Sequence, residues 1–253
     1  MAANTNRIVI IGATSRIAEE CARLWVAEAP VDITLVGRNR EKLQRVADDL
    51  AVRSPASTIS VREADFHDPA IIAALADELS GQKPVHIVLI AHGSLPDQQE
   101  CQADLLKAKE ALDINGVSPA LFAEAFAGHM ERRNMGSLIL IGSVAGDRGR
   151  KSNYVYGAAK GLVTRYAQGL QHRLAKTGVT VSLVKPGPTD TPMTAELKAA
   201  GKGGGLADPA AVAKTIVQGA AKGRATIYAP GKWTLIMLII RHLPRFIFNK
   251  MNI

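Results

Sequence analysis

The stretch Arg7-Ile-Val-Ile-Ile-Gly-Ala-Thr-Ser-Arg-Ile-Ala18 decides the fold of this chain. Its first part, Arg7–Ile11, is rich in β-branched apolar side chains, which is typical of a strand buried on both faces. Gly12 then permits a tight turn, and a helical pattern runs from about Arg16 to Glu28. A buried strand that turns through a glycine into a helix is the first half of a βαβ unit, and it predicts a parallel sheet.

The same alternation continues along the chain. Further strands are predicted at 33–36, 59–62, 85–90, 138–141, 180–184 and 225–228, and further helices at 41–52, 69–79, 102–132 with an interruption near Asn115, and 153–176. No internal repeat or linker divides the sequence. We therefore expect one α/β domain over 1–253, a Rossmann-like doubly wound parallel sheet of about seven strands with helices on both faces.

Composition agrees with a folded globular domain. The chain has 253 residues, of which 47% are hydrophobic and 21% charged, enough for one large core. Cys21 and Cys101 show no disulfide or metal-ligand spacing, so we expect a reducing compartment and no metal site. The N-terminal residues lack the apolar region of a signal peptide. The expected location is the cytoplasm.

The net charge of +8 is concentrated at the C-terminus. Residues 232–253 contain Lys232, Arg241, Arg245 and Lys250 and no acidic side chain, which accounts for half of the excess. Basic proteins meet anions such as phosphates, membranes or nucleic acid. Because aromatic residues do not interleave a basic stripe, nucleic acid is not an expected partner.

The turn after the first strand is a candidate phosphate site. Helix N-termini present backbone N–H groups to a pyrophosphate, and Thr14, Ser15, Arg16 and Ile17 occupy this position. The usual fingerprint has glycines at several places, of which only Gly12 is present. The alternative is an ordinary strand-to-helix turn with a surface arginine.

The end of the second strand indicates which dinucleotide binds. An acidic residue there would accept the ribose hydroxyls of NAD, but the sequence has Arg38, whose guanidinium suits a 2′-phosphate. This favours NADPH/NADP over NAD. The alternative is that Arg38 is an ordinary solvent-exposed residue of a loop. Asp65 is placed to bond the adenine amine with Phe66 beside it, and Ala91 and Gly93 bring backbone close to the cofactor.

Tyr156 and Lys160 are the candidate catalytic pair, because residues at i and i+4 share a helix face. A lysine ammonium beside a phenol favours the phenolate, so we expect the pKa of Tyr156 to fall from about 10 toward neutrality. Ser143 offers a hydrogen bond to a carbonyl oxygen. With a hydride donor nearby, such a site interconverts a ketone and an alcohol. Taken alone, the same spacing also occurs on solvated helix faces.

Together these elements resemble the short-chain dehydrogenase/reductase family, in order and in spacing. The matching positions are Gly12, Asp65, Ala91–Gly93, Asn115, Ser143, Tyr156 with Lys160, and Pro186-Gly187. Two departures touch the cofactor site: Arg16 and Ala18 replace later glycines, and Ala-His-Gly stands where many members have Asn-Ala-Gly.

The resemblance implies a role for each residue. Tyr156 donates the proton, Ser143 orients the carbonyl, and Lys160 lowers the tyrosine pKa and bonds the nicotinamide ribose. Asn115 holds a water that relays protons to Lys160, or alternatively has a purely structural role. The nicotinamide cradle is assigned to Pro186, Gly187, Thr189 and Thr191.

A closer likeness is to the decaprenylphosphoryl-2-keto-erythro-pentose reductases, carried by residues 143–156 and 228–248. It implies NADPH-dependent reduction of the 2-keto group of a polyprenylphosphoryl pentose. That step is the second half of a C2 epimerisation that follows a flavin-dependent oxidase and yields an arabinosyl donor for cell-wall biogenesis. Alternatives are a 3-oxoacyl, steroid-like or soluble-sugar ketone, or a non-catalytic NADP-sensing protein.

Three segments are left to choose the substrate. Residues 190–208 read as a flexible substrate flap or a surface insertion. Arg148, Arg150 and Lys151 receive a substrate phosphate or form a solvated loop. The apolar-basic tail, 232–253, has an apolar run too short to span a bilayer. It therefore lies at the inner membrane face or, as in many family members, forms subunit contacts of a homo-oligomer.

Overall fold

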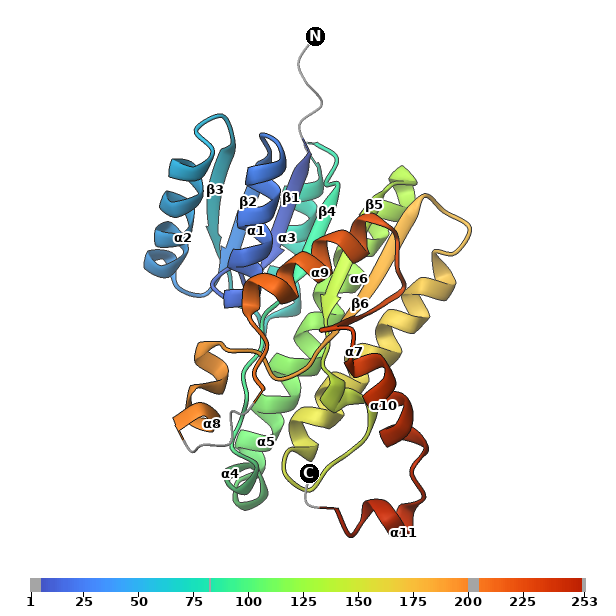
Figure 1. Ribbon diagram of the computed structural model, residues 1–253. Coiled ribbons are helices and arrows are strands. Elements are labelled where there is room, and N and C mark those ends of the chain that lie inside the picture. Colours follow the sequence, from blue (N-terminus) through green and yellow to red (C-terminus); the bar gives the residue numbers. More distant parts are fainter. Residues whose placement is uncertain (1–5, 82, 200–204, 252–253) are drawn as a thin grey trace.

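The computed structural model describes residues 6–81, 83–199 and 205–251. Seven parallel strands form one sheet in the order β3-β2-β1-β4-β5-β6-β7 (Figure 1). The predicted doubly wound sheet is confirmed. The strands are β1 Arg7–Ile11, β2 Asp32–Gly37, β3 Thr58–Glu63, β4 Ile87–Ile90, β5 Gly136–Ile141, β6 Val179–Pro186 and β7 Thr226–Ala229.

Helices cover both faces of the sheet. One face carries α1 (Arg16–Glu28), α2 (Arg40–Arg53) and α9 (Pro209–Ala221), and the other carries α3 (Pro69–Gly81), α6 (Ser118–Arg133) and α7 (Tyr154–Arg173). Strand β1 supplies both cores, since Ile8 and Ile10 pack in the first and Val9 and Ile11 in the second. This is why the first strand is apolar at every position after Arg7.

The predicted helix over 102–132 is divided differently. It consists of α4 (Gln98–Ala103), α5 (Leu105–Leu112), a π-turn (Asp113–Val117) and α6. The break comes at Asp104, whose carboxylate caps α5 by accepting from Leu106 N at 2.8 Å. Asn115 does not end the helix but sits within the π-turn. Single π-turns of this kind are frequent at functional sites.

Several short elements lie beyond the C-terminal ends of the strands. The 3₁₀ turns η2 (Val144–Asp147) and η3 (Pro192–Thr194) and the helix α8 (Ala195–Ala199) follow β5 and β6. A parallel bridge between Thr189 and Ala207 closes the base of the predicted flap, whose residues 200–204 lie outside the described part. The chain ends in α10 (Trp233–His242) and α11 (Arg245–Phe248). Of the helices described, none has the length and apolar character to cross a membrane.

A buried ion pair ties η2 to the last two strands. The Asp147 and Lys185 side chains are bonded and only 2% and 5% exposed. The Tyr228 hydroxyl donates to the other carboxylate oxygen of Asp147 at 2.7 Å. The Lys185 ammonium also lies 5.6 Å from the centroid of the Tyr228 ring. The turn that follows β5 is therefore held against β6 and β7.

We expect Asp147→Asn to destabilise the fold by about 3–5 kcal/mol, because it leaves the Lys185 ammonium buried without a counter-charge. Urea unfolding of the whole chain measures the change. The control is Glu78→Gln, which removes a half-exposed pair with Arg62 at 3.1 Å and should cost less than about 1 kcal/mol. Equal unfolding midpoints for the two variants would show that the buried pair contributes nothing.

Candidate active site

The site lies where the strand order reverses between β1 and β4. Ligands bind at such switch points, outside the carboxyl ends of parallel strands. Gly12 has φ +80°, and a Cβ on it would lie 2.6 Å from the backbone N of His92. The turns after β1 and β4 are therefore in backbone contact, and a glycine is required at this position.

Ser143, Tyr156 and Lys160 come together beside this crevice. Ser143 precedes η2, and its hydroxyl accepts from Ala145 N at 3.1 Å. A side-chain hydrogen bond joins it to Tyr156, on the first turn of α7. A Cβ on Gly157 would lie 2.9 Å from Ala145 O, so the small residue lets η2 pack directly on α7.

The predicted fall of the Tyr156 pKa is wrong for the chain alone. Desolvation raises that pKa above 10, against the lowering effects of the Ser143 bond and the Arg150 charge. Lys160 does not supply the lowering that was expected of it. Its Nζ bonds Ile141 O at 3.0 Å and lies 5.8 Å from the Tyr156 ring centroid. The cost of taking the phenolate out of water exceeds the stabilisation that its neighbours give it.

Lys160 and Asn115 both approach Gly93 where a side chain would otherwise stand. A Cβ built on Gly93 would be 2.7 Å from Asn115 Oδ1 and 3.5 Å from Lys160 Nζ. The Asn115 amide accepts from Ser94 N at 2.8 Å and donates to Ala111 O at 3.0 Å. Asn115 thus holds the segment after β4, while the water relay to Lys160 stays a prediction. Burial lowers the pKa of Lys160 to about 8.

The predicted phosphate turn begins α1. Ser15 is its N-cap residue and makes no side-chain cap, which leaves the first N–H groups of the helix open to a ligand. Thr14 is exposed beside it. The Arg16 guanidinium is held by Glu19 and Glu20 at 3.1 and 2.7 Å, so a phosphate would compete with two carboxylates. Ile17 is in the core and has only its backbone to offer.

The predicted adenosine residues lie on the same edge of the sheet. Arg38 is exposed, and across the described ranges its side chain has no hydrogen bond or ion pair. Asp65 is exposed and accepts from His67 N at 2.8 Å. Phe66 is buried against the His92 ring, with centroids 4.7 Å apart, and Ala91 is buried. Arg38 and Asp65 therefore offer side chains to a ligand, and the other two only backbone.

His92 has a larger part in the site than the sequence indicated. It is buried, and its Nε2 bonds Ser118 Oγ at 2.9 Å, while its Nδ1 has no partner among the described residues. Burial and then the charges of Lys160, Arg38 and His67 hold its pKa well below 6.5. The imidazole is neutral, and the surrounding cations suit an anionic ligand.

The residues predicted to cradle the nicotinamide lie at and just after the end of β6. The buried Thr189 hydroxyl donates to Gly187 O at 2.9 Å, and the half-buried Thr191 caps η3. Pro186 is buried at the strand end. No sequence motif predicts Trp233 at this position, yet a Cβ on Gly187 would lie only 1.8 Å from its indole Nε1. The bare glycine is the one signal that something packs against this position.

The three basic residues after η2 divide into separate roles. Arg148 donates to Leu243 O at 2.7 Å and to Ile240 O, and it lies 3.7 Å above the Phe248 ring. It holds the C-terminal helices, so its guanidinium is already engaged, and its predicted phosphate contact stays a prediction. Arg150 is half-buried next to Tyr156 and has no side-chain hydrogen bond or ion pair within the described chain. Lys151 is exposed.

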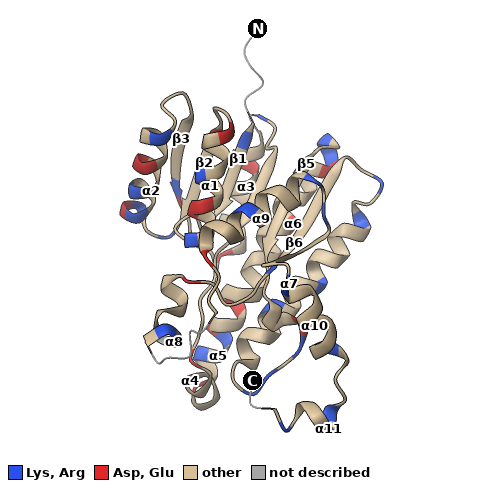
Figure 2. Cartoon of the chain, viewed as in Figure 1, with Lys and Arg blue, Asp and Glu red and all other residues tan. Residues whose placement is uncertain are grey.

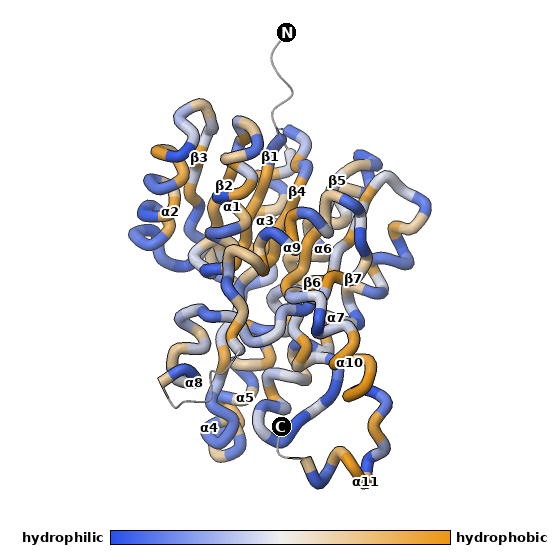
Figure 3. Tube along the Cα trace, in the orientation of Figure 1, coloured by the Kyte–Doolittle hydropathy of each residue, from blue (hydrophilic) through white to orange (hydrophobic). Residues whose placement is uncertain are grey.

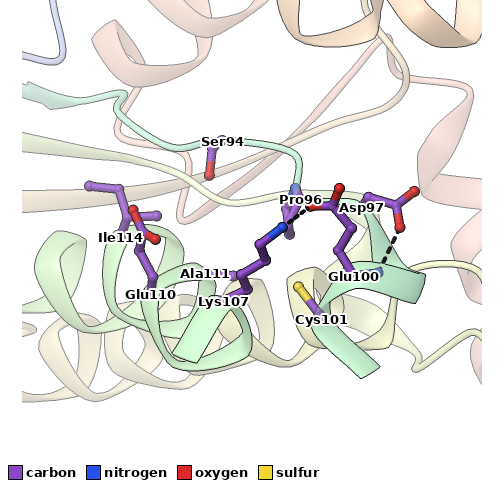
Figure 4. A pocket seen from close by; sticks show the side chains of 9 residues that line it. All are labelled: Ser94, Pro96, Asp97, Glu100, Cys101, Lys107, Glu110, Ala111 and Ile114. Carbon is purple, nitrogen blue, oxygen red and sulfur yellow. Dashed lines mark hydrogen bonds and ion pairs between the residues drawn. The ribbon is translucent and has the colours of Figure 1, made fainter. Parts of the chain in front are cut away.

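A cavity of about 260 Å³ adjoins the site on the side of Ser94 (Figure 4). Asp97, Glu100 and Glu110 line it, and Lys107 is already bonded to Glu100 at 2.8 Å. An excess of carboxylates does not suit a phosphate. Of the two regions next to the site, the cavity beside Ser94 and the loop that carries Arg150, the loop is the one that fits an anionic substrate group.

Comparisons with known proteins agree with this geometry. A family model described as short chain dehydrogenase matches residues 6–202. An uncharacterized oxidoreductase from Mycobacterium tuberculosis is 31% identical over 247 residues, covering 96% of each chain. Another from Streptomyces coelicolor is 28% identical over 245 residues, covering 96% of this chain and 95% of that one.

Solved structures share the fold. A short-chain dehydrogenase from Sphingobium yanoikuyae in complex with NADPH has a TM-score of 0.80 at 20% identity, covering 95% of this chain and 97% of that one. An actinorhodin polyketide ketoreductase with NADPH has a TM-score of 0.80 at 21% identity, covering 90% and 97%.

The depressed pKa of Lys160 predicts a pH-dependent stability. Below pH 8 both folded and unfolded chains bind the proton, and folding buries the charge. Between about 8, the folded value, and the ordinary 10.5, only the unfolded chain keeps the proton. Wild type should therefore gain stability relative to Lys160→Met as the pH rises through this window, by about 3 kcal/mol in all.

Urea unfolding at pH 7 and pH 10 measures this difference, with Lys222→Met at an exposed position as the control. The same stability gap between wild type and Lys160→Met at both pH values would contradict a depressed pKa.

Proposed function

The chain belongs to the short-chain dehydrogenase/reductase family of oxidoreductases, and on that premise we propose that it reduces a ketone to a secondary alcohol with NADPH. The observation that carries the proposal is the bonded pair of Ser143 and Tyr156 hydroxyls at the switch-point crevice, with Lys160 and Asn115 both close to Gly93. The two hydroxyls can polarise a carbonyl and donate a proton to it, and a buried lysine lies close by.

The residues present fit a dinucleotide. Cβ atoms on Gly12 and Gly93 would collide with the neighbouring turns, so the crevice floor is bare backbone. The first turn of α1 is uncapped by side chains, and Arg38, whose side chain has no partner among the described residues, favours a cofactor with a 2′-phosphate. The residues that would hold NADPH are Thr14, Ser15, Arg38, Asp65, Ala91, Gly93, Lys160, Pro186, Gly187, Thr189 and Thr191. When bound, NADPH supplies the hydride for the carbonyl carbon.

The protein supplies position and a proton. Ser143 donates a hydrogen bond that polarises the carbonyl oxygen. Tyr156, whose pKa lies above 10, is protonated at neutral pH and transfers its proton to that oxygen as the alcohol forms. Lys160, with a pKa of about 8, is mostly charged at neutral pH and can return a proton toward the tyrosine. A raised tyrosine pKa thus keeps the proton donor for ketone reduction in its protonated form at neutral pH.

For the substrate, we propose the 2-keto group of a polyprenylphosphoryl pentose. Two observations support this choice: the likeness of residues 143–156 and 228–248 to reductases of that class, and the half-buried Arg150 guanidinium beside Tyr156. A phosphate would give that cation the partner it lacks in the described structure. The reaction would follow a flavin-dependent oxidase that makes the ketone, in a homo-oligomeric enzyme of the cytoplasm.

Tyr156→Phe tests the reaction. The variant lacks the proton donor and should lose about 100-fold or more in rate, while calorimetry shows NADPH binding retained. NADPH consumption with a ketone gives the rate. Tyr166→Phe is the matched control on the same helix, since its hydroxyl bonds Glu124 at 2.8 Å. An undiminished rate in Tyr156→Phe would refute the proposed role.

Arg150→Gln tests the substrate. Its KM for the oxidase-generated keto lipid should rise about 10- to 100-fold, the range of a hydrogen bond to a charged group, whereas KM for a neutral ketone should stay unchanged. Arg165→Gln, exposed and bonded only to Gln168 at 3.0 Å among described partners, is the control. An equal loss with both ketones would mean that Arg150 acts through Tyr156 and does not bind phosphate.

A further inference from the structure

Helix α10 is apolar on two opposite faces. Its inner face consists of Trp233, Ile236, Met237 and Ile240 at spacings i, i+3, i+4 and i+7, which form one stripe of a helix. Met237 is only 4% exposed, and the other three are half-buried. This face attaches the helix to the body of the protein.

The outer face, on the opposite side of the helix, also carries apolar side chains at i, i+3 and i+4, but these are exposed. Leu235, Leu238 and Ile239 are 64%, 54% and 55% exposed. Helix α11 adds Phe246 and Ile247, at 70% and 42%. Figure 3 shows this apolar colour on α10 and α11, beyond the sheet. A helix that is apolar all round is normally covered all round, so this outer surface lacks a packing partner among the described residues.

The outer surface is held in place. Arg148 bonds the last carbonyls of α10 and lies against Phe248 of α11, while Trp233 at the other end of α10 packs on Gly187. Both anchors adjoin the active site, one through η2 and the other through the end of β6. Whatever covers the outer surface therefore lies close to the mouth of the site.

The charge around the outer surface indicates which kind of partner binds it. Lys232, Arg245 and Lys250 are exposed close in sequence to the outer-surface residues, and 232–253 contains no acidic residue. The Arg241 side chain is instead bonded to Tyr228. Figure 2 colours the basic part of α11 blue. A second copy of the chain on a twofold axis would place the same cations against one another. An anionic lipid surface would instead attract each of them.

We propose that the outer surface, made by Leu235, Leu238, Ile239, Phe246 and Ile247, docks in the plane of an anionic phospholipid interface. The apolar side chains enter the acyl boundary and the flanking cations face the headgroups, without crossing the bilayer. This interaction goes beyond the proposed reaction and holds for whichever ketone the site reduces.

Flotation of the full chain with vesicles of phosphatidylglycerol and phosphatidylcholine tests the proposal. Wild type should float with these vesicles, and it should float several-fold less with phosphatidylcholine alone or at high salt. The triple variant Leu235→Gln/Leu238→Gln/Ile239→Gln should stay at the bottom. Leu105→Gln/Leu106→Gln is the matched control, since those leucines are 82% and 77% exposed elsewhere on the molecule, and it should float like wild type.

Arg245→Gln/Lys250→Gln separates charge from apolar contact. It should weaken binding about five-fold for each cation removed, the equivalent of about 1 kcal/mol. Thermal melting and NADPH-dependent ketone reduction of each variant show that the fold and the site are intact. Equal flotation of wild type and the outer-face triple variant overturns the proposal. So does a wild-type dimer in sedimentation that the triple variant dissociates while neither protein floats, because a second copy is then the cover.

Discussion

Close backbone packing at the C-terminal edge of the sheet is the constraint on which the rest of the site depends. The turn at Gly12 touches the turn at His92, and a Cβ on Gly146 would lie 2.6 Å from the backbone carbon of Lys160. Such contacts leave no room for side chains between adjacent elements. They bring η2 onto α7 and thereby set Ser143 against Tyr156. The two hydroxyls are positioned because glycines, which have no side chain, let the backbones pack closely.

Burial then governs the protonation of the groups held there. It raises the pKa of Tyr156 and lowers those of Lys160 and His92, in each case because a low-dielectric site disfavours the charged form. The charge that opposes this effect on Tyr156 comes from Arg150, a residue of the loop. The sequence motif identifies a tyrosine and a lysine, but the electrostatics of the pair belong to the surroundings.

The C-terminal segment is part of the same construction. Arg148 follows the turn that begins at Ser143 and holds α10 and α11, and Asp147 in that turn is buried with Lys185 and Tyr228. Neighbouring residues of one loop thus serve the fold, the tail and the site. This division explains how a surface beside the site can be apolar and basic without disturbing the chemistry. The Asp147–Lys185 pair and the Arg148 guanidinium lie between the C-terminal helices and the site.

The sequence by itself determined the parallel sheet, because a strand buried on both faces is apolar at consecutive positions and each glycine turn leads into a helix. It also predicted which residues meet at the crevice, since the carboxyl ends of parallel strands share one edge. Only the tertiary structure decided that Asn115 lies in a π-turn, that Arg148 holds the tail while Arg150 faces Tyr156, and that Trp233 covers Gly187. Those outcomes depend on contacts between residues far apart in the chain, and on the desolvation that follows from them, neither of which leaves a local pattern.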